Sequence, residues 1–344
     1  MKILKFSSIA LVLVFAATDI FAQSKTDAIQ LYNAGLEEGK AGNYDAAISS
    51  FTQAITIAEQ IGGDGEDIKN RSERQIPAMY YQKAREAYAT YQSERGVETL
   101  DQTIEAFKQA SEVADEYDDQ RIAPQAKGVI PQLYYQKSLL LYNEDDFEGS
   151  EEAVARALNL NSNYALAYYQ QAKIYKKMND TNGNGIIDQG IDELLNWYDQ
   201  AITIGESTNK ADVVSRARDS AHDELLALGT RAIENENIQE AVSLLDRALT
   251  YDEQSADAHY RLAEVYNKAG NPNDAISHAQ QALEFENGGR TDRAKIYYEL
   301  GYAHQDLGNK SEACDAFSNA LFGSFKSPAE HKMEFELKCG STAP

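Results

Sequence analysis

A small residue that recurs along the chain limits the folds open to this sequence more than any other feature. Seven segments share an alanine at one position of the same pattern, and in six of them an aromatic or aliphatic residue stands three positions earlier. Successive alanines are 56, 47, 44, 47, 34 and 38 residues apart. Such internal similarity is typical of stacked helical repeats, in which each unit buries its apolar face against the next. The alanines are Ala54, Ala110, Ala157, Ala201, Ala248, Ala282 and Ala320, and the bulky residues are Phe51, Phe107, Val154, Tyr198, Leu245 and Phe317.

The residues around these alanines predict pairs of helices joined by short turns. In several segments a second alanine stands seven positions earlier, and small residues at both places let two helices approach closely. Between the expected helices the chain contains Gly-Asn. Glycine tolerates the left-handed conformation that ends a first helix, and asparagine can cap the second. The second alanines are Ala47, Ala241, Ala275 and Ala313, and the turns begin at Gly42-Asn43, Gly270-Asn271 and Gly308-Asn309.

These residues resemble the tetratricopeptide repeat (TPR) family, and the resemblance covers nearly all of residues 25–325. The best matches are residues 28–61, 222–255, 256–289 and 294–327, while the repeats around 75–112, 129–162 and 165–204 carry insertions. The resemblance implies an all-α fold, a right-handed TPR solenoid of about seven helix-turn-helix repeats over residues 23–326. A generic helical bundle is the alternative, and no alternating strand pattern competes with either.

Residues 327–344 are expected to form a capping helix and a tail. Ser327 is placed to cap this helix, Pro328 to occupy its first position and Glu330 to complete a capping box, so the helix should run to about Leu337. A repeat stack needs such a cover, because its last repeat otherwise exposes an apolar face.

The two cysteines, Cys314 and Cys339, flank an expected turn near Phe325. In an antiparallel helical hairpin they could come level with each other, which predicts a disulfide in an oxidising compartment. A buried free thiol at Cys314 and a loose one at Cys339 are the alternative.

The N-terminus has the features of a secretory signal peptide. Lys2 and Lys5 form a short positive start, the apolar run Ile9 to Ala17 follows, and Ala22 is a small residue suitable for cleavage. We therefore expect residues 1–22 to be removed from an exported bacterial protein, whose mature chain is periplasmic and not inserted in the membrane. A membrane anchor is the alternative, but the apolar stretch is short for a span.

Charge and motif content narrow the function. The chain carries 32 Lys and Arg against 55 Asp and Glu, a net charge of −23, which argues against nucleic acid as a partner. Its 5 histidines are dispersed. No nucleophile elbow, phosphate-binding loop or dinucleotide-binding turn is present. We expect a binding protein, not an enzyme, with no required cofactor.

An insertion at residues 180–192 is similar to an EF-hand calcium loop, because oxygen-bearing side chains fall at positions 1, 3, 5 and 9 and Gly185 falls at position 6. Position 12, usually a glutamate, is Ile191, so Asp192 or Glu193 would have to close the site. Calcium binding would then be weak, and an Asn/Gly turn without metal is an equal alternative. The candidate ligands are Asp180, Asn182, Asn184, Ile186 through its carbonyl, Asp188 and Asp192.

Tyrosine pairs recur in the expected first helices, as in Tyr80-Tyr81, Tyr134-Tyr135 and Tyr168-Tyr169. In the TPR register the first tyrosine faces the core and the second faces the inner groove. Tyrosine combines a rigid apolar surface with a hydroxyl and suits recognition of peptides or sugars. Packing against the neighbouring repeat is the alternative. The candidate groove residues are Tyr81, Tyr135, Tyr142, Tyr169, Tyr260, Tyr298 and Tyr302.

Three lysines follow one of these tyrosines, Lys173, Lys176 and Lys177, and we interpret them as a solvated face. The sequence thus favours a periplasmic TPR scaffold that holds a protein or peptide partner in a tyrosine-rich concave groove. The alternative is a glycan- or small-ligand-binding TPR protein of the cell envelope without a lipid anchor.

Overall fold

The computed structural model describes residues 24–340, and the signal-peptide prediction for residues 1–22 lies outside them. The described residues form helices and turns without a β-strand. Contacts between helices divide the chain into two compact units with a boundary after Ile130, inside α6 (Ile122–Asn143). No helix in residues 24–340 is both long enough and apolar enough to cross a membrane.

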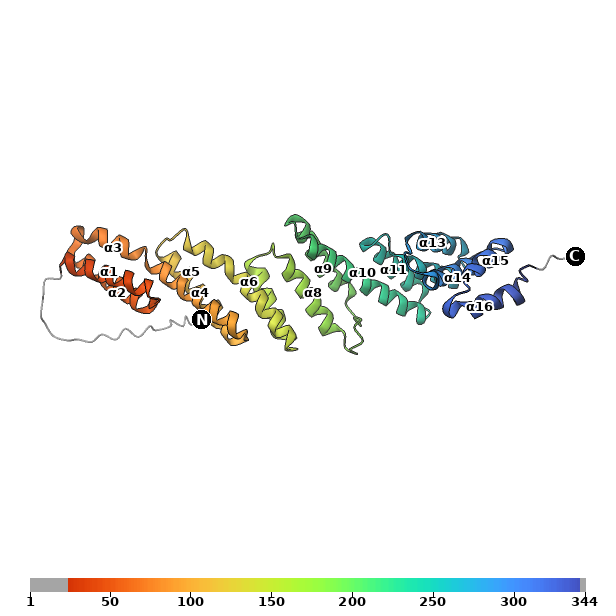
Figure 1. Ribbon diagram of the computed structural model, residues 1–344, viewed down its shortest axis with the longest axis horizontal. Coiled ribbons are helices and arrows are strands. Elements are labelled where there is room, and N and C mark those ends of the chain that lie inside the picture. Colours follow the sequence, from red (N-terminus) through yellow and green to blue (C-terminus); the bar gives the residue numbers. More distant parts are fainter. Residues whose placement is uncertain (1–23, 341–344) are drawn as a thin grey trace, which may run out of the picture. The chain divides into compact units, whose positions relative to one another are not determined.

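The first unit contains two helix pairs, and Figure 1 shows the helices of each pair side by side. Between the two pairs the chain adds a short helical insertion. The pairs are α1 (Lys25–Lys40) with α2 (Tyr44–Ile61), and α4 (Ile76–Glu94) with α5 (Val97–Glu116); the insertion is η1 (Gly62–Gly65) and α3 (Glu66–Glu73).

The second unit continues the same plan from the second half of α6. The pairs after it are α8 (Ala165–Asn179) with α9 (Ile191–Ser207), α10 (Ala211–Glu234) with α11 (Ile238–Tyr251), α12 (Ala256–Lys268) with α13 (Pro272–Phe285), and α14 (Arg290–Asp306) with α15 (Lys310–Asn319). The helix α7 (Phe147–Leu160) follows α6 as its partner in the repeat pattern and contacts α8. Each predicted repeat therefore corresponds to two consecutive helices, which confirms the all-α repeat fold.

The recurring alanines lie where the sequence pattern placed them. All seven are fully buried, and the bulky residues three positions earlier are buried beside them. Some contacts leave no room even for a methyl group, because a Cβ atom on Gly301 would stand 2.9 Å from the ring of Phe317. Small residues thus allow the two helices of a pair to pack closely against each other.

The turns confirm the glycine prediction and correct the asparagine one. Gly42 and Gly270 have φ angles of +83° and +73°, the left-handed conformation expected at the end of a helix. Asn43 and Asn271 stand at the N-cap positions, but their side chains make no capping hydrogen bond. The backbone N–H of Asn43 instead donates to the carbonyl of Glu38 and closes the preceding helix. The turn asparagine therefore caps the C-terminal end of the preceding helix through its backbone, and its side chain does not cap the helix that follows.

The C-terminal cover is present, but it begins differently from the prediction. The helix α16 (Lys326–His331) follows the 3₁₀ turn η2 (Gly323–Phe325) and continues as a π-helical segment, η3 (Lys332–Glu336). Its first residue is Lys326 and no side chain caps it, so the capping role predicted for Ser327 is wrong. The 3₁₀ turn already leads into the helix, which places Ser327 inside its first turn.

This cover packs on the last helix pair and is bonded to it. Ala329, Met333 and Leu337 join the apolar cluster around Phe317. The predicted pairing of the cysteines is present as a Cys314–Cys339 disulfide with a Cα–Cα distance of 5.8 Å.

Candidate binding site

The predicted groove tyrosines pack against neighbouring side chains, in several cases those of their own repeat. The second tyrosine of a pair lies against the bulky residue of the second helix, with ring centroids 5.8 Å apart for Tyr81–Phe107 and 6.1 Å for Tyr169–Tyr198. Tyr81 belongs to the first unit, and the other six tyrosines belong to the second. Most of these seven tyrosines are partly buried, because one part of each ring packs against other side chains while another part is exposed to solvent.

The tyrosines of the second unit lie in different surroundings. Tyr135 packs on Tyr164, with the ring centroids 5.1 Å apart. Tyr260 is only 7% exposed and has a guanidinium and an ammonium over its ring. Four others line pockets between first helices, namely Tyr142, Tyr169, Tyr298 and Tyr302.

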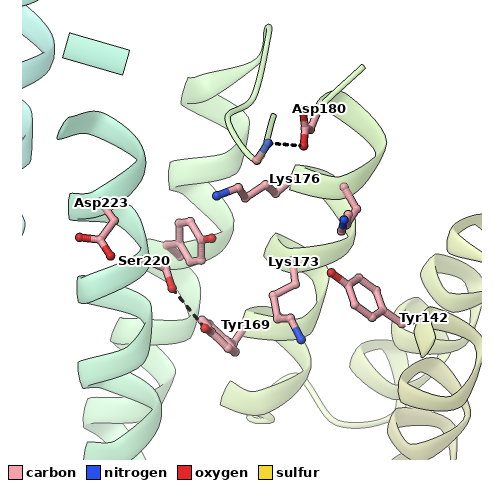
Figure 2. Close-up of a pocket in the computed structure, with 10 residues that line it drawn as sticks. Tyr142, Tyr169, Lys173, Lys176, Asp180, Ser220 and Asp223 are labelled. Carbon is pink, nitrogen blue, oxygen red and sulfur yellow. Dashed lines mark hydrogen bonds between the residues drawn. The ribbon is translucent and has the colours of Figure 1, made fainter. Parts of the chain in front are cut away.

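A pocket of about 320 Å³ between α8 and α10 brings several lysines and tyrosines together, and we call it the lysine–tyrosine pocket. Figure 2 shows Tyr142 from α6, Lys173 and Lys176 from α8, and Ser220 and Asp223 from α10 around it. The complete lining is Tyr142, Tyr169, Lys173, Lys176, Lys177, Asp180, Gly185, Tyr198, Ser220 and Asp223.

The three lysines reach this pocket together because they are spaced along one helical face. Lys173, Lys176 and Lys177 follow Tyr169 by four, seven and eight residues, the spacing of neighbours on one side of a helix. The interpretation of these lysines as a solvated face is therefore wrong for Lys173, which is partly buried. The spacing was the signal in the sequence that could have identified it.

Lys173 is the central cation of the pocket. Its ammonium lies 4.7 Å from the centroid of the Tyr142 ring. Burial, and then the positive charge of Arg216, lower the pKa of Lys173 below its ordinary value. Among the described residues no carboxylate is within ion-pair distance of this lysine. An anion bound at this point would therefore offset the positive charges of Lys173 and Arg216.

The carboxylates around the pocket are already engaged within the protein. Asp180 accepts hydrogen bonds from the backbone N–H groups of Asn184 and Gly185 at 3.0 and 2.8 Å. Asp223 faces the Nδ1 atom of His222 at 3.1 Å. Both carboxylates thus have contacts within the protein, and neither is within ion-pair distance of Lys173.

The tyrosines contribute neutral donors. The hydroxyl of Tyr169 lies 3.2 Å from the Oγ atom of Ser220, a bond drawn in Figure 2. Burial raises the pKa of Tyr142 and of Tyr198 above the ordinary value, so both hydroxyls stay protonated at neutral pH. An ammonium, hydroxyl donors and aromatic walls in one cavity suit an anionic group attached to an apolar or amide-bearing chain.

A smaller pocket of about 260 Å³ lies between α12 and α14. Tyr298 and Tyr302 line it together with Asn267 and Glu299, which the sequence did not single out. The Nδ2 atom of Asn267 donates to the Glu299 carboxylate at 2.8 Å. Burial raises the pKa of Glu299 to about 7. No sequence pattern identified these residues, because the contact joins two helices.

The residues of the calcium-like loop are held together by hydrogen bonds. Asp188 accepts from the backbone N–H of Thr181 at 2.9 Å and from the Nδ2 atom of Asn182 at 2.7 Å. The side-chain oxygen of Asn184 accepts from the N–H of Ile186 at 2.9 Å. This network also suits the Asn/Gly turn that the sequence left open.

The donor set of the loop fits calcium only in part. Its early positions supply oxygens, but Asp192 forms an ion pair with Arg247 at 2.7 Å, and Ile191 at position 12 has no oxygen in its side chain. Within residues 24–340 no cluster of three or more His, Cys, Asp or Glu side chains is arranged to hold a metal ion. The loop thus offers fewer ligands than calcium prefers.

Comparisons with known proteins agree with the helix-pair architecture. Family models described as tetratricopeptide repeat match residues 31–61, 232–292 and 294–321. These segments correspond to the pairs with the most regular alanine and glycine pattern, and they are tetratricopeptide repeats. No curated protein matches its sequence.

Three solved structures illustrate the likeness. A crystal structure of MamA protein is 20% identical, covers 63% of this chain and 100% of its own, and has a TM-score of 0.34. YrrB, described as a TPR protein with an unusual peptide-binding site, is 20% identical over 67% of this chain and 100% of its own, with a TM-score of 0.33. The TPR2AB domain of yeast Sti1, in complex with pHSP90, is 14% identical over 92% of this chain and 97% of its own, with a TM-score of 0.29.

Proposed function

We propose that this protein is an exported, periplasmic TPR scaffold that binds a protein or peptide partner, and that an acidic segment of the partner enters the lysine–tyrosine pocket. The observation that carries the proposal is Lys173, a partly buried lysine beside a tyrosine ring with no carboxylate partner among the described residues. A carboxylate bound there would gain a charge-assisted hydrogen bond in a site that already excludes part of the solvent.

The architecture supports binding rather than catalysis. Stacked helix pairs present an extended surface built from their first helices, the form that repeat proteins use for recognition. The pocket contains aromatic walls and donors that are fixed by packing, which lowers the entropy lost when a partner binds. An enzyme would need a nucleophile or an acid–base pair, and neither is distinguished in the sequence.

The periplasmic location is proposed from the N-terminal sequence pattern. A disulfide between Cys314 and Cys339 supports it, because such bonds persist in oxidising compartments and are rare in the cytosol.

A peptide titration tests the pocket directly. The probe is an N-acetylated, C-terminally amidated tetra-aspartate peptide, and tetra-asparagine of the same length is its matched control. We expect the purified protein to bind the acidic peptide and not the neutral one in isothermal titration calorimetry. Replacing Lys173 by Gln should weaken binding about tenfold, because it removes the charge-assisted bond.

A surface lysine serves as the control for net charge. Lys310→Gln removes the same charge at an exposed position on α15 and should leave the affinity within about twofold, because exposed charges are screened by solvent and salt. Equal losses for both variants, or equal binding of the two peptides, would show that the pocket does not select an anion.

The natural partner can be sought by affinity capture from envelope extract with wild-type protein and Lys173→Gln in parallel. A partner retained by the first and lost by the second supports the scaffold. A specific sugar on a glycan array that does not depend on Lys173 would favour the glycan-binding alternative.

Calcium binding by loop 180–192 stays a prediction. With the donors that the loop offers, any site is expected to be weak, with a dissociation constant on the order of 10⁻⁴ M or higher. Calorimetric titration with calcium should show one site that Asp180→Asn removes. No heat and no thermal shift at millimolar calcium would leave the loop as an Asn/Gly turn.

A further inference from the structure

The lysine–tyrosine pocket contains a second lysine, Lys176, whose ammonium pairs with a carboxylate of the protein itself. Lys176 lies one helical turn from Lys173 on α8, yet its ammonium forms an ion pair with Glu224 of α10. In Figure 2 the Lys176 ammonium points away from that of Lys173. Of these two lysines on one face of α8, Lys176 is thus paired within the protein, and only Lys173 is free to contact a ligand.

Glu224 is unusually well buried for a carboxylate. Its side chain is 1% exposed, whereas that of Lys176 is 33% exposed. Burying a charge is costly unless it is paired and hydrogen-bonded, so this carboxylate must have strong partners. Lys176 supplies one of them.

The other partner is the backbone of the calcium-like loop. One carboxylate oxygen of Glu224, Oε1, accepts from the N–H of Ile187 at 2.6 Å, and the other, Oε2, faces Lys176. Ile187 is itself 1% exposed in the core of the unit. Two turns along α10, Arg231 donates to the carbonyl of Ile187 at 3.1 Å. Two side chains of α10 therefore bind the N–H and the carbonyl of Ile187, and these contacts fix the position of the Glu224 carboxylate.

We infer that Glu224 is a positioning residue for the pocket: anchored by the Ile187 amide, it withdraws Lys176 from the anion and leaves binding to Lys173 and Lys177. This inference rests on the proposed function and adds a limit to it. The pocket therefore binds an anion less tightly than its three lysines could together. The Ile187 end of loop 180–192 holds Glu224 in place and so determines how many of these lysines can contact the anion.

Glu224→Gln is the informative change. It keeps the shape of the side chain and an oxygen for the Ile187 N–H, but it presents no charge to Lys176. Lys176 should turn towards the pocket, and the tetra-aspartate peptide should bind about fivefold more tightly, the gain expected for one partly exposed ion pair.

A double-mutant cycle separates this mechanism from simple removal of negative charge. Affinities are compared for wild type, Glu224→Gln, Lys176→Gln and the double variant. We expect the gain from Glu224→Gln to be lost when Lys176 is absent. The same gain in both backgrounds would overturn the inference, because long-range charge alone would then explain it.

Lysine labelling tests the inference without any ligand. Under brief treatment with acetic anhydride, followed by mass spectrometry, Lys176 of wild type should react several times more slowly than the exposed Lys177. Glu224→Gln should raise the Lys176 rate close to that of Lys177. An unchanged Lys176 rate in this variant would contradict the inference.

The two proposals fail in distinguishable ways. Absence of peptide binding in wild type with the expected labelling contradicts the proposed function only. If Glu224→Gln does not fold, as judged by circular dichroism, Glu224→Asp replaces it. This variant keeps the charge but is too short to reach the Ile187 N–H and Lys176 together, so Lys176 labelling should again rise. Unchanged labelling in the folded Asp variant overturns the inference.

Discussion

The partly buried carboxyl of Glu299 makes the stability of this protein depend on pH in a way that one substitution should remove. Glu299 lies on α14 at the smaller pocket, with the Nδ2 atom of Asn267 at 2.8 Å from its carboxylate. Burial is the main reason that its pKa is raised from 4.5 to about 7, and the nearby Glu264 raises it further. The Asn267 hydrogen bond, Lys268 and Arg261 act in the opposite direction.

The sign of the effect follows from the two states of the chain. In the unfolded chain Glu299 loses its proton near its ordinary pKa of 4.5, whereas in the folded protein it keeps the proton until about pH 7. Between these values the folded state binds more protons, so stability falls as pH rises through the window and levels off above it. A pKa change from 4.5 to about 7 corresponds to a loss of up to about 3 kcal/mol.

Glu299→Gln replaces the titrating group by a neutral one of the same shape. We expect the variant to match wild type near pH 4 and to exceed it by about 1–3 kcal/mol at pH 8, because it never has to bury a charge. The Oδ1 atom of Asn267 is buried without a hydrogen-bond partner in the described structure, and the new amide brings a donor close to it.

The assay is urea denaturation followed by far-UV circular dichroism at pH 4.5, 6 and 8. Glu312→Gln is the control, since it removes the same charge from an exposed position on α15. The reasoning is refuted if Glu299→Gln and wild type show the same dependence of unfolding free energy on pH, or if Glu312→Gln reproduces the gain.

Three further outcomes follow from the packing. Reducing the Cys314–Cys339 disulfide should lower the free energy of unfolding by about 3 kcal/mol in the chain-entropy model, measured by denaturation with and without reductant; two free thiols in the unreduced protein would contradict the disulfide. Gly301→Ala should cost about 1–3 kcal/mol, because its methyl group would meet Phe317. Gly128→Ala, where no atom lies within 4 Å of the new methyl group, should stabilise by up to about 1 kcal/mol in the same assay; equal effects of the two alanines would refute the close-packing argument. Binding of the tetra-aspartate peptide should fade as pH rises through the lowered pKa of Lys173, since only the charged lysine attracts the anion; affinity that stays constant while Lys173 is titrated would contradict this role.

The repeat architecture was predictable because it depends on local periodicity. An alanine such as Ala248 occupies a fixed turn of a fixed helix, so its burial follows from its place in the pattern. The left-handed conformation of Gly270 was equally predictable, because a helix followed by a tight turn requires it. The proximity of Cys314 and Cys339 was predictable from the number of residues that separate each cysteine from the turn between their helices.

The binding pocket was only partly predictable. Tyr169 was identified from its pair, and the spacing of Lys173 placed that lysine on the same face. The partners from α10 were not identified, because Ser220 lies 51 residues from Tyr169 and Glu224 lies 37 residues from Ile187. The lengths of the insertions and the rotation of one helix against another decide such contacts, and local periodicity carries neither.

What the sequence by itself determined is therefore the stack of helix pairs, their buried alanines, their turns and the excess of negative charge. What only the tertiary structure decided is which charges remain available. Three neighbouring lysines look equivalent along the chain, but in the folded protein Lys176 is paired with Glu224 while Lys173 lies against a tyrosine ring. The physical reason is that an ion pair depends on distance and desolvation across two helices, and both arise only when the helices pack.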